Sequence, residues 1–214
     1  MRALSSVLLL TLLLGHPGAS AQESGRDKAV QALAGADAPA RREAAARLGE
    51  IGTMADMKAL AAALRDPDAV TREHAEEAMW QIWARSGSAE VDRLYQSGIE
   101  QMSAGDLDRA IATFSRIIQI EPAFAEGWNK RATLYFLAGD LRKSLADCDE
   151  VMKRNPYHFG ALAGYAQIYV KLERYDRALE YSRRALEVNP NLDAVKHNIE
   201  VLEELLAERR KRTV

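Results

Sequence analysis

The residues that could do metal or thiol chemistry are few, and their spacing does not fit such a site. After residue 21 the histidines are His74, His158 and His197, and the chain has a single cysteine, Cys148. Zinc sites use histidines three to five residues apart or closely paired cysteines, and neither spacing occurs. We therefore predict no metal site, and we interpret Cys148 as a core packing residue rather than a redox thiol.

Motifs for nucleophilic catalysis and for cofactor binding are also missing from the sequence. It contains no Gly-x-Ser-x-Gly elbow, no phosphate-binding loop and no dinucleotide fingerprint. Acidic pairs such as Glu76-Glu77 and Glu203-Glu204 are explained more simply as solvated faces of helices. The sequence therefore predicts a protein that is not an enzyme and that needs no cofactor.

The strongest pattern in the chain is a repeat of 34 residues. Pro122, Pro156 and Pro190 are 34 residues apart, and each ends a near-copy of a helix-turn-helix pattern. A fixed period of this length is typical of a solenoid, which usually provides a surface for another chain rather than a pocket for chemistry. The three units span 91–124, 125–158 and 159–192.

Small residues recur inside each unit where two antiparallel helices would touch. Such residues allow helix axes to approach to about 8–10 Å. They stand at positions 8 and 20 of the units: Gly98, Ala132 and Ala166, then Ala110, Ser144 and Ala178. Gly105 and Gly139 suit the left-handed residue after a first helix, and Asp106 and Asp140 can cap the second one.

This pattern resembles the tetratricopeptide repeat (TPR) family, and the segment WNKRATLYFLAGDLRKSLADCDEVMKRNP reads like a whole unit. The resemblance implies an all-α fold, an α-solenoid in which antiparallel helix pairs form a right-handed superhelix. Three positions depart from the family pattern: Gln101 replaces an aromatic residue, Arg131 a leucine, and Glu173 the turn glycine. We expect residues 193–208 to form the capping helix and residues 209–214 a basic tail.

The TPR resemblance also implies a concave groove lined by the first helix of each unit. We predict that a peptide or helix binds there, because amide side chains can both donate to and accept from a ligand backbone. TPR modules that hold chaperone C-termini use a clamp of basic and amide residues, of which only Asn129 and Lys130 are present. In an alternative interpretation the capping helix or the HEAT-like segment partly fills the groove. The predicted groove residues are Tyr95, Ile99, Met102, Asn129, Thr133, Phe136, Leu137, Gln167, Val170 and Lys171.

A second, shorter repeat lies in residues 22–87. Arg41 matches Arg72, and Leu48 matches Met79, each pair 31 residues apart. We interpret this region as HEAT-like helical repeats, with an alanine-rich helical bundle as the alternative. Trp80 and Trp83 share one helix face at its end, so they are expected to pack the joint with the TPR units; an exposed aromatic anchor for a partner is the alternative.

The first 21 residues have the pattern of a secretory signal peptide. Arg2 precedes a mostly apolar run from Ala3 to Leu14, and Ala19-Ser20-Ala21 fits a cleavage site. The run is shorter than the roughly 20 apolar residues that span a bilayer. No cysteine stands at the end of this run, because Cys148 is the only cysteine in the chain, and this argues against a lipoprotein. We therefore expect a periplasmic or secreted protein with no integral membrane segment after signal cleavage.

Charge gives no reason to expect a nucleic-acid partner. Cleavage after residue 21 removes Arg2 and no acid, which leaves 28 basic and 31 acidic residues. We therefore expect a protein or peptide partner, and the hypothesis is an exported, non-enzymatic interaction scaffold or adaptor. The alternative hypothesis is a structural component or assembly factor of a cell-envelope complex, held through its convex or end faces.

Overall fold

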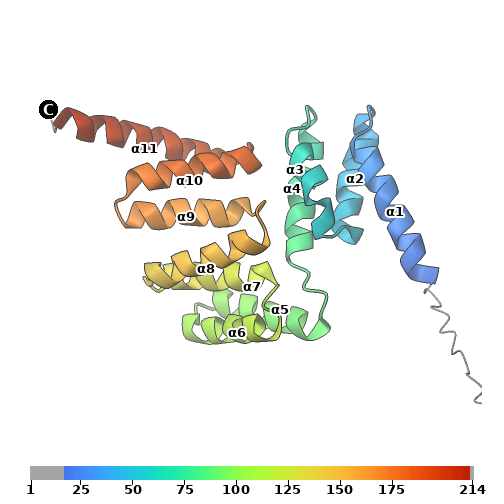
Figure 1. Ribbon diagram of the computed structural model, residues 1–214, viewed down its shortest axis with the longest axis horizontal. Coiled ribbons are helices and arrows are strands. Elements are labelled where there is room, and N and C mark those ends of the chain that lie inside the picture. Colours follow the sequence, from blue (N-terminus) through green and yellow to red (C-terminus); the bar gives the residue numbers. More distant parts are fainter. Residues whose placement is uncertain (1–16, 213–214) are drawn as a thin grey trace, which may run out of the picture.

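The computed structural model describes residues 17–212, which form eleven α-helices, one short 3₁₀ turn and no β-strand. The all-α solenoid of antiparallel helix pairs is confirmed (Figure 1). None of the helices within this range is both long and apolar enough to cross a bilayer. The N-terminal block consists of α1 (Pro17–Leu33), α2 (Ala38–Ile51), η1 (Met54–Asp56), α3 (Met57–Ala63) and α4 (Ala69–Trp83).

Six helices form the predicted repeat units, two helices to a unit. The pairs are α5 (Ala89–Ser103) with α6 (Leu107–Ile120), α7 (Ala125–Leu137) with α8 (Leu141–Arg154), and α9 (Phe159–Lys171) with α10 (Tyr175–Val188). The last helix, α11 (Asp193–Arg212), packs on α10. It continues four residues beyond the expected capping helix, so most of the predicted basic tail is the helix's final turn.

The turn inside the first two units has the left-handed backbone that its glycine predicts, and the third unit keeps this backbone without a glycine. Gly105 and Gly139 adopt φ values of +75° and +81°, and Glu173 at the equivalent position adopts +55°. A side chain in this left-handed region costs roughly 1–2 kcal/mol. The side chains of Asp106 and Asp140 accept the backbone N–H groups of the next helix, as expected for N-caps.

Small residues mark the close contact between the helices of a unit. Ala110, Ser144 and Ala178 are all buried at equivalent positions. A Cβ atom added to Gly98 would lie only 2.7 Å from the ring of Phe114, so the first unit has no room for a side chain there. The predicted register of the repeats therefore places the small residues at the helix contacts.

Two of the three departures from the family pattern have polar partners. Gln101 accepts a hydrogen bond of 2.7 Å from the Thr113 hydroxyl. Arg131 makes a bidentate ion pair with Asp147, at 2.8 and 2.9 Å, and a third bond to Ser115. These contacts replace apolar packing with hydrogen bonds between the two helices of a unit or between neighbouring units.

The N-terminal block has an internal similarity that matches its 31-residue repeat. Helices α2 and α4 pack against each other, and the equivalent residues Leu48 and Met79 are fully buried between the helices of the block. Arg41 and Arg72 each donate to backbone carbonyls of the turn before their own helix. The structure thus gives both copies the same local contacts, while their likeness to HEAT repeats stays a prediction.

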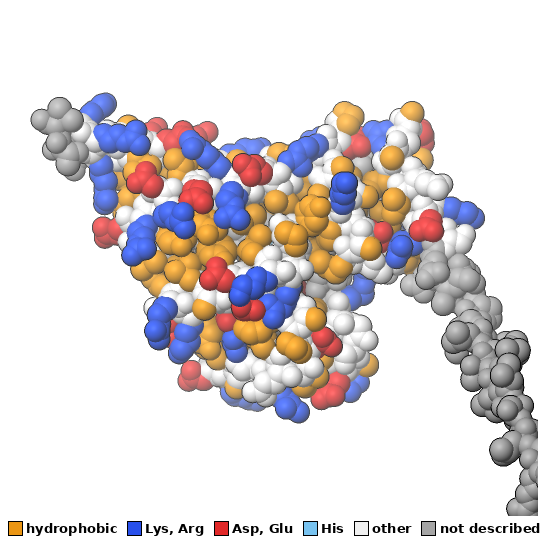
Figure 2. Space-filling view, viewed as in Figure 1, with side chains coloured by type: hydrophobic (Ala, Val, Ile, Leu, Met, Phe, Trp, Pro, Cys, Tyr) orange, Lys and Arg blue, Asp and Glu red, His pale blue; other side chains and the backbone are white. Residues whose placement is uncertain are grey.

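The N-terminal block does not continue the stack of units. It stands at the side of the stack, across the ends of the helices, with α3 and α4 nearest to the units (Figure 1). Hydrophobic side chains gather where α4 meets the turn between α8 and α9 (Figure 2). The block therefore covers the edge formed by the turns between units, and we call this edge the joint edge.

Candidate functional site

Helices α7 and α9 bring four of the predicted groove residues together around one narrow pocket of about 60 Å³. Asn129, Thr133 and Phe136 come from α7, and Gln167 comes from α9. Cys148 and Gly164 also line this pocket, and the cysteine is buried as predicted. Burial raises the pKa of the Cys148 thiol to about 12, so the thiol is neutral and unreactive at neutral pH.

Three further predicted residues lie exposed near the ends of the same two helices. Leu137 is 56% exposed and Val170 is 43% exposed, so both apolar side chains are accessible to a ligand. Lys171 is exposed as well, and its ammonium lies 5.9 Å from the ring of Phe136. The groove between α7 and α9 therefore offers apolar surface, amide groups and one positive charge.

The first unit contributes less to the groove than the sequence predicts. Tyr95 is buried, with its ring against Phe114 and Phe124, so it cannot be the ligand contact that its position suggested. Ile99 and Met102 are half-buried and pack against the core of this unit. Large side chains at Phe114 and Phe124 draw the α5 residues into the core instead of leaving them free.

Beneath the groove lies a buried carboxylate, Glu126, which contacts four side chains from three places in the chain. His158 contacts it through Nε2 at 2.5 Å, and the Asn129 amide donates to its two oxygens at 3.2 and 3.1 Å. The Tyr95 hydroxyl and the Lys130 ammonium each lie 3.5 Å away. This network ties the first helices of units one and two to the turn that precedes unit three.

The hydrogen bonds of His158 define its tautomer. Its Nδ1 accepts the backbone N–H of Ala161 at 3.0 Å, so the ring proton is on Nε2 and is donated to Glu126. Burial raises the pKa of Glu126, but His158, Lys130 and Asn129 outweigh burial and hold this pKa below its usual range. Glu126 is therefore an ionised group inside the protein, held by directed donors.

The same network uses the two residues that resemble a carboxylate clamp. Asn129 and Lys130 both contact the carboxylate of Glu126, one through a hydrogen bond and one through an ion pair. A ligand carboxylate would have to compete with a buried one already in place. The groove is therefore suited to apolar and amide contacts rather than to holding a terminal carboxylate.

The joint edge is built around the two tryptophans, as the sequence predicted. Trp83 stacks on the His158 ring with centroids 4.5 Å apart, and Trp80 meets Phe159 edge-on at 5.2 Å. A Cβ atom added to Gly160 would come within 2.7 Å of the Trp80 ring. The partner of α4 is thus the turn between units two and three, although α5 follows α4 in the chain.

Sequence reasoning missed the pairing of Glu126 with His158. Neither residue is among the predicted groove residues, and His158 is considered there only as a possible metal ligand. A signal for the pair does exist, because both residues belong to one unit, at its second and last positions. Stacking of units in a solenoid brings the start of a unit's first helix beside the turn that leads into the following unit.

The described residues contain no group of three or more histidine, cysteine or acidic side chains that could hold a metal ion. Glu126 and His158, an acid-base pair 2.5 Å apart, are both buried and bonded to protein groups. A substrate therefore has no direct access to them.

Comparison with known proteins supports the prediction of TPR repeats. Residues 135–197 match the family described as Tetratricopeptide repeat. A TPR repeat-containing protein of Rhizobium etli is 34% identical over 125 residues, which is 58% of this chain and 61% of that relative. Human DnaJ homolog subfamily C member 3 is 25% identical over 57% of this chain and 25% of its own length. This chain therefore spans only part of these relatives.

Solved structures show the same fold. The Sgt2 TPR domain from Aspergillus fumigatus aligns with a TM-score of 0.55 and 22% identity, covering 58% of this chain and 83% of that domain. The first TPR of Spaghetti, solved with the HSP90 peptide SRMEEVD, aligns with a TM-score of 0.53 and 20% identity over 55% of this chain and 93% of its own. At these identities the likeness concerns the fold.

Proposed function

We propose that this chain is an exported, non-enzymatic adaptor that holds an extended peptide or a helix of a partner protein in the groove between α7 and α9. The observation that carries the proposal is the grouping of Asn129, Thr133, Phe136 and Gln167 around one pocket beside the exposed Leu137 and Val170. TPR domains generally mediate contacts between proteins, and the similar TPR of Spaghetti binds a peptide.

The chemistry of the groove limits what it would bind. Apolar side chains of the ligand would contact Phe136, Leu137 and Val170, while the Gln167 amide would pair with its backbone. Lys171 favours an acidic residue in the ligand at that end of the groove. A free C-terminal carboxylate is not required, because Asn129 and Lys130 are bonded to Glu126.

The test is a selection of random peptides displayed on phage against the purified chain, followed by titration of a selected peptide. Phe136→Ala should weaken binding by about 1–2 kcal/mol, because it removes a central apolar anchor. Circular dichroism should show an unchanged fold. Gln96→Ala is the matched control, since Gln96 is exposed on α5 and is not one of the predicted groove residues.

If peptides bind and Phe136→Ala leaves their affinity unchanged, the groove proposal fails. The alternative, an envelope assembly component held through its convex or end faces, would then gain support. In that case substitutions on α6, α8 or α11 should reduce binding of the selected peptide instead.

Export is the second part of the proposal, and it rests on the sequence of residues 1–21. Residues 1–16 lie outside the described residues, and α1 begins at Pro17 and continues through the predicted cleavage position after Ala21. Mass spectrometry of the natural protein should find a chain that starts at Gln22. A cytosolic protein that retains Met1 would contradict the proposal.

A further inference from the structure

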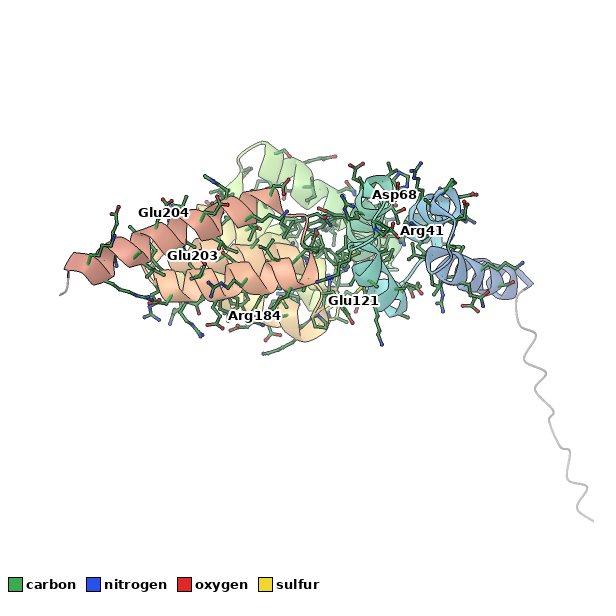
Figure 3. All side chains as sticks on the ribbon, turned by 90° about the horizontal axis from the view of Figure 1, so that it is seen from above. Arg41, Asp68, Glu121, Arg184, Glu203 and Glu204 are labelled. Atoms are coloured by element: carbon green, nitrogen blue, oxygen red, sulfur yellow. The ribbon has the colours of Figure 1, made fainter. Side chains whose placement is uncertain are left out.

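A cavity of about 170 Å³ lies on the joint edge, between the N-terminal block and the turn that joins α6 to α7. Its apolar wall includes Trp83 and Phe124, both of which are buried. Its polar wall includes Arg85, Glu121 and Asn155. Figure 3 labels Glu121 where the units meet the N-terminal block. This cavity is separate from the groove between α7 and α9, and the proposed function does not use it.

Asn155 is the residue that makes this cavity a candidate site. It is fully buried, and its Nδ2 group has no hydrogen-bond partner among the described residues. Its Oδ1 accepts the backbone N–H of Tyr157 at 3.1 Å, which fixes the orientation of the amide. A buried donor left without an acceptor destabilises the folded chain, so an acceptor inside the cavity would be favoured.

The repeat provides an internal comparison that indicates what kind of acceptor fits. Asn189 is the residue equivalent to Asn155 in the next unit, and each of them follows the last residue of its helix. Its Oδ1 accepts the N–H of Asn191 at 3.0 Å, just as Asn155 accepts that of Tyr157. Its Nδ2, however, donates to the carboxylate of Glu76 at 2.9 Å. At the equivalent position the acceptor is thus a carboxylate.

The charges around the cavity agree with a carboxylate ligand. The Arg85 guanidinium donates to the carbonyls of Gly49 and Gly52, and no carboxylate of residues 17–212 pairs with it. A guanidinium has five N–H donors, so several remain for an anion. Arg154, which also lines the cavity, already pairs with Glu150 and therefore adds little.

Glu121 further restricts the chemical groups that the ligand can carry. It occupies the same unit position as Asn155 and Asn189, and its carboxylate has no bonded partner in the described part of the chain. A ligand that carried only a carboxylate would be repelled by it. A ligand with an N–H group next to its carboxylate would instead satisfy Asn155 and Arg85 with one end and Glu121 with the other.

We propose that the cavity on the joint edge binds an α-amino acid unit through its carboxylate, with Asn155 and Arg85 as donors, Glu121 as the acceptor of its N–H, and Trp83 and Phe124 against an apolar side chain. Such a unit has two sources: a free amino acid, which carries an ammonium group, and the C-terminal residue of a polypeptide, which carries an amide N–H. Both share the carboxylate and the adjacent donor.

Three probes distinguish these possibilities: leucine, N-acetyl-leucine and N-acetyl-leucinamide. The full-length chain, labelled with ¹⁵N, is titrated with each while the side-chain signals of Asn155 and Trp83 are followed by NMR. We expect the Asn155 signals to shift with a carboxylate probe, and N-acetyl-leucinamide to bind at least about tenfold more weakly. Tighter binding of leucine identifies the free amino acid, and tighter binding of N-acetyl-leucine identifies the chain end.

Asn155→Asp keeps the acceptor for the Tyr157 N–H and replaces the donor by a negative charge. It should reduce the affinity for the carboxylate probe by more than about tenfold. Asn189→Asp is the matched control at the equivalent position, opposite Glu76, and should leave this affinity unchanged. Phe136→Ala should also leave the affinity for the carboxylate probe unchanged. The cavity proposal and the groove proposal can therefore fail independently, one in the probe titration and the other in the peptide titration.

If Asn155→Asp does not fold, Glu121→Gln provides a second test. It should weaken binding of leucine more than that of N-acetyl-leucine, because an ammonium loses more than an amide when the carboxylate is removed. Equal binding of N-acetyl-leucinamide and N-acetyl-leucine would overturn the proposal. The absence of any shift of the Asn155 signals with all three probes would also overturn the proposal, and water would then be the occupant of the cavity.

Discussion

The two edges of the repeat stack are organised in different ways. The turns within units, at Gly105, Gly139 and Glu173, form an edge that the N-terminal block does not cover, and all three share a left-handed backbone. At the joint edge the equivalent residues differ in type from unit to unit, as Phe124, His158 and Leu192 do. Each contacts a different neighbour there, because the N-terminal block is not itself part of the 34-residue repeat.

This difference indicates which turn residues a sequence repeat can predict. A turn that is defined only by its backbone conformation favours glycine, as at Gly105 and Gly139, and Glu173 keeps the same conformation at a steric cost. A turn that packs against another part of the chain selects a residue for that particular contact, such as His158 between Trp83 and Glu126. The period of the sequence therefore predicts the first edge and not the second.

The largest effect should come from breaking the joint edge with Trp83→Ala. The substitution removes a buried ring that contacts His158 and Phe159, and truncations of this kind typically cost about 3–5 kcal/mol. Urea unfolding followed by circular dichroism measures the loss. A loss below about 1 kcal/mol, the size of an exposed substitution, would show that the block does not support the stack.

A smaller loss of unfolding free energy is expected at acidic pH. The folded pKa of Glu126 is below its unfolded value, so its contribution is complete above about pH 4.5 and is lost as the pH falls towards the folded pKa of about 2. The loss should be on the order of 3 kcal/mol. Unfolding free energies of the natural chain and of Glu126→Gln, compared at neutral and acidic pH, isolate this term from other carboxylates. Parallel pH profiles would contradict it.

The smallest effect concerns the uncovered edge. Glu173→Gly should stabilise the chain by about 0.5–1 kcal/mol, because glycine adopts a positive φ without steric cost. The ion pair from Glu173 to Arg209 is exposed and would be lost with little effect. Gly139→Ala, at the equivalent position, should destabilise. Equal thermal midpoints for these two variants would show that the edge is not governed by backbone conformation.

Much of the fold could be predicted because the repeat requires similar residues at equivalent positions of the three units. Small residues at 110, 144 and 178 and a buried Cys148 follow directly from the register. The groove could be predicted only in part, since the burial of Tyr95 depends on Phe114 and Phe124 together. The pairing of Glu126 with His158 follows only from the way neighbouring units stack, and the unpaired Nδ2 of Asn155 depends on three-dimensional neighbours that no local spacing encodes.

The contacts between the N-terminal block and the last unit have a consequence for how the chain unfolds. Arg65 donates to the carbonyls of Glu187 and Val188, and Asn191 donates to the carbonyl of Leu64 at 2.7 Å. In an open solenoid each unit touches only its neighbours, so the terminal units fray independently. Here residues more than 120 positions apart hold the two halves together. Opening of the last unit must also release α3 and α4, and amide hydrogen exchange at both places should therefore occur as one cooperative event.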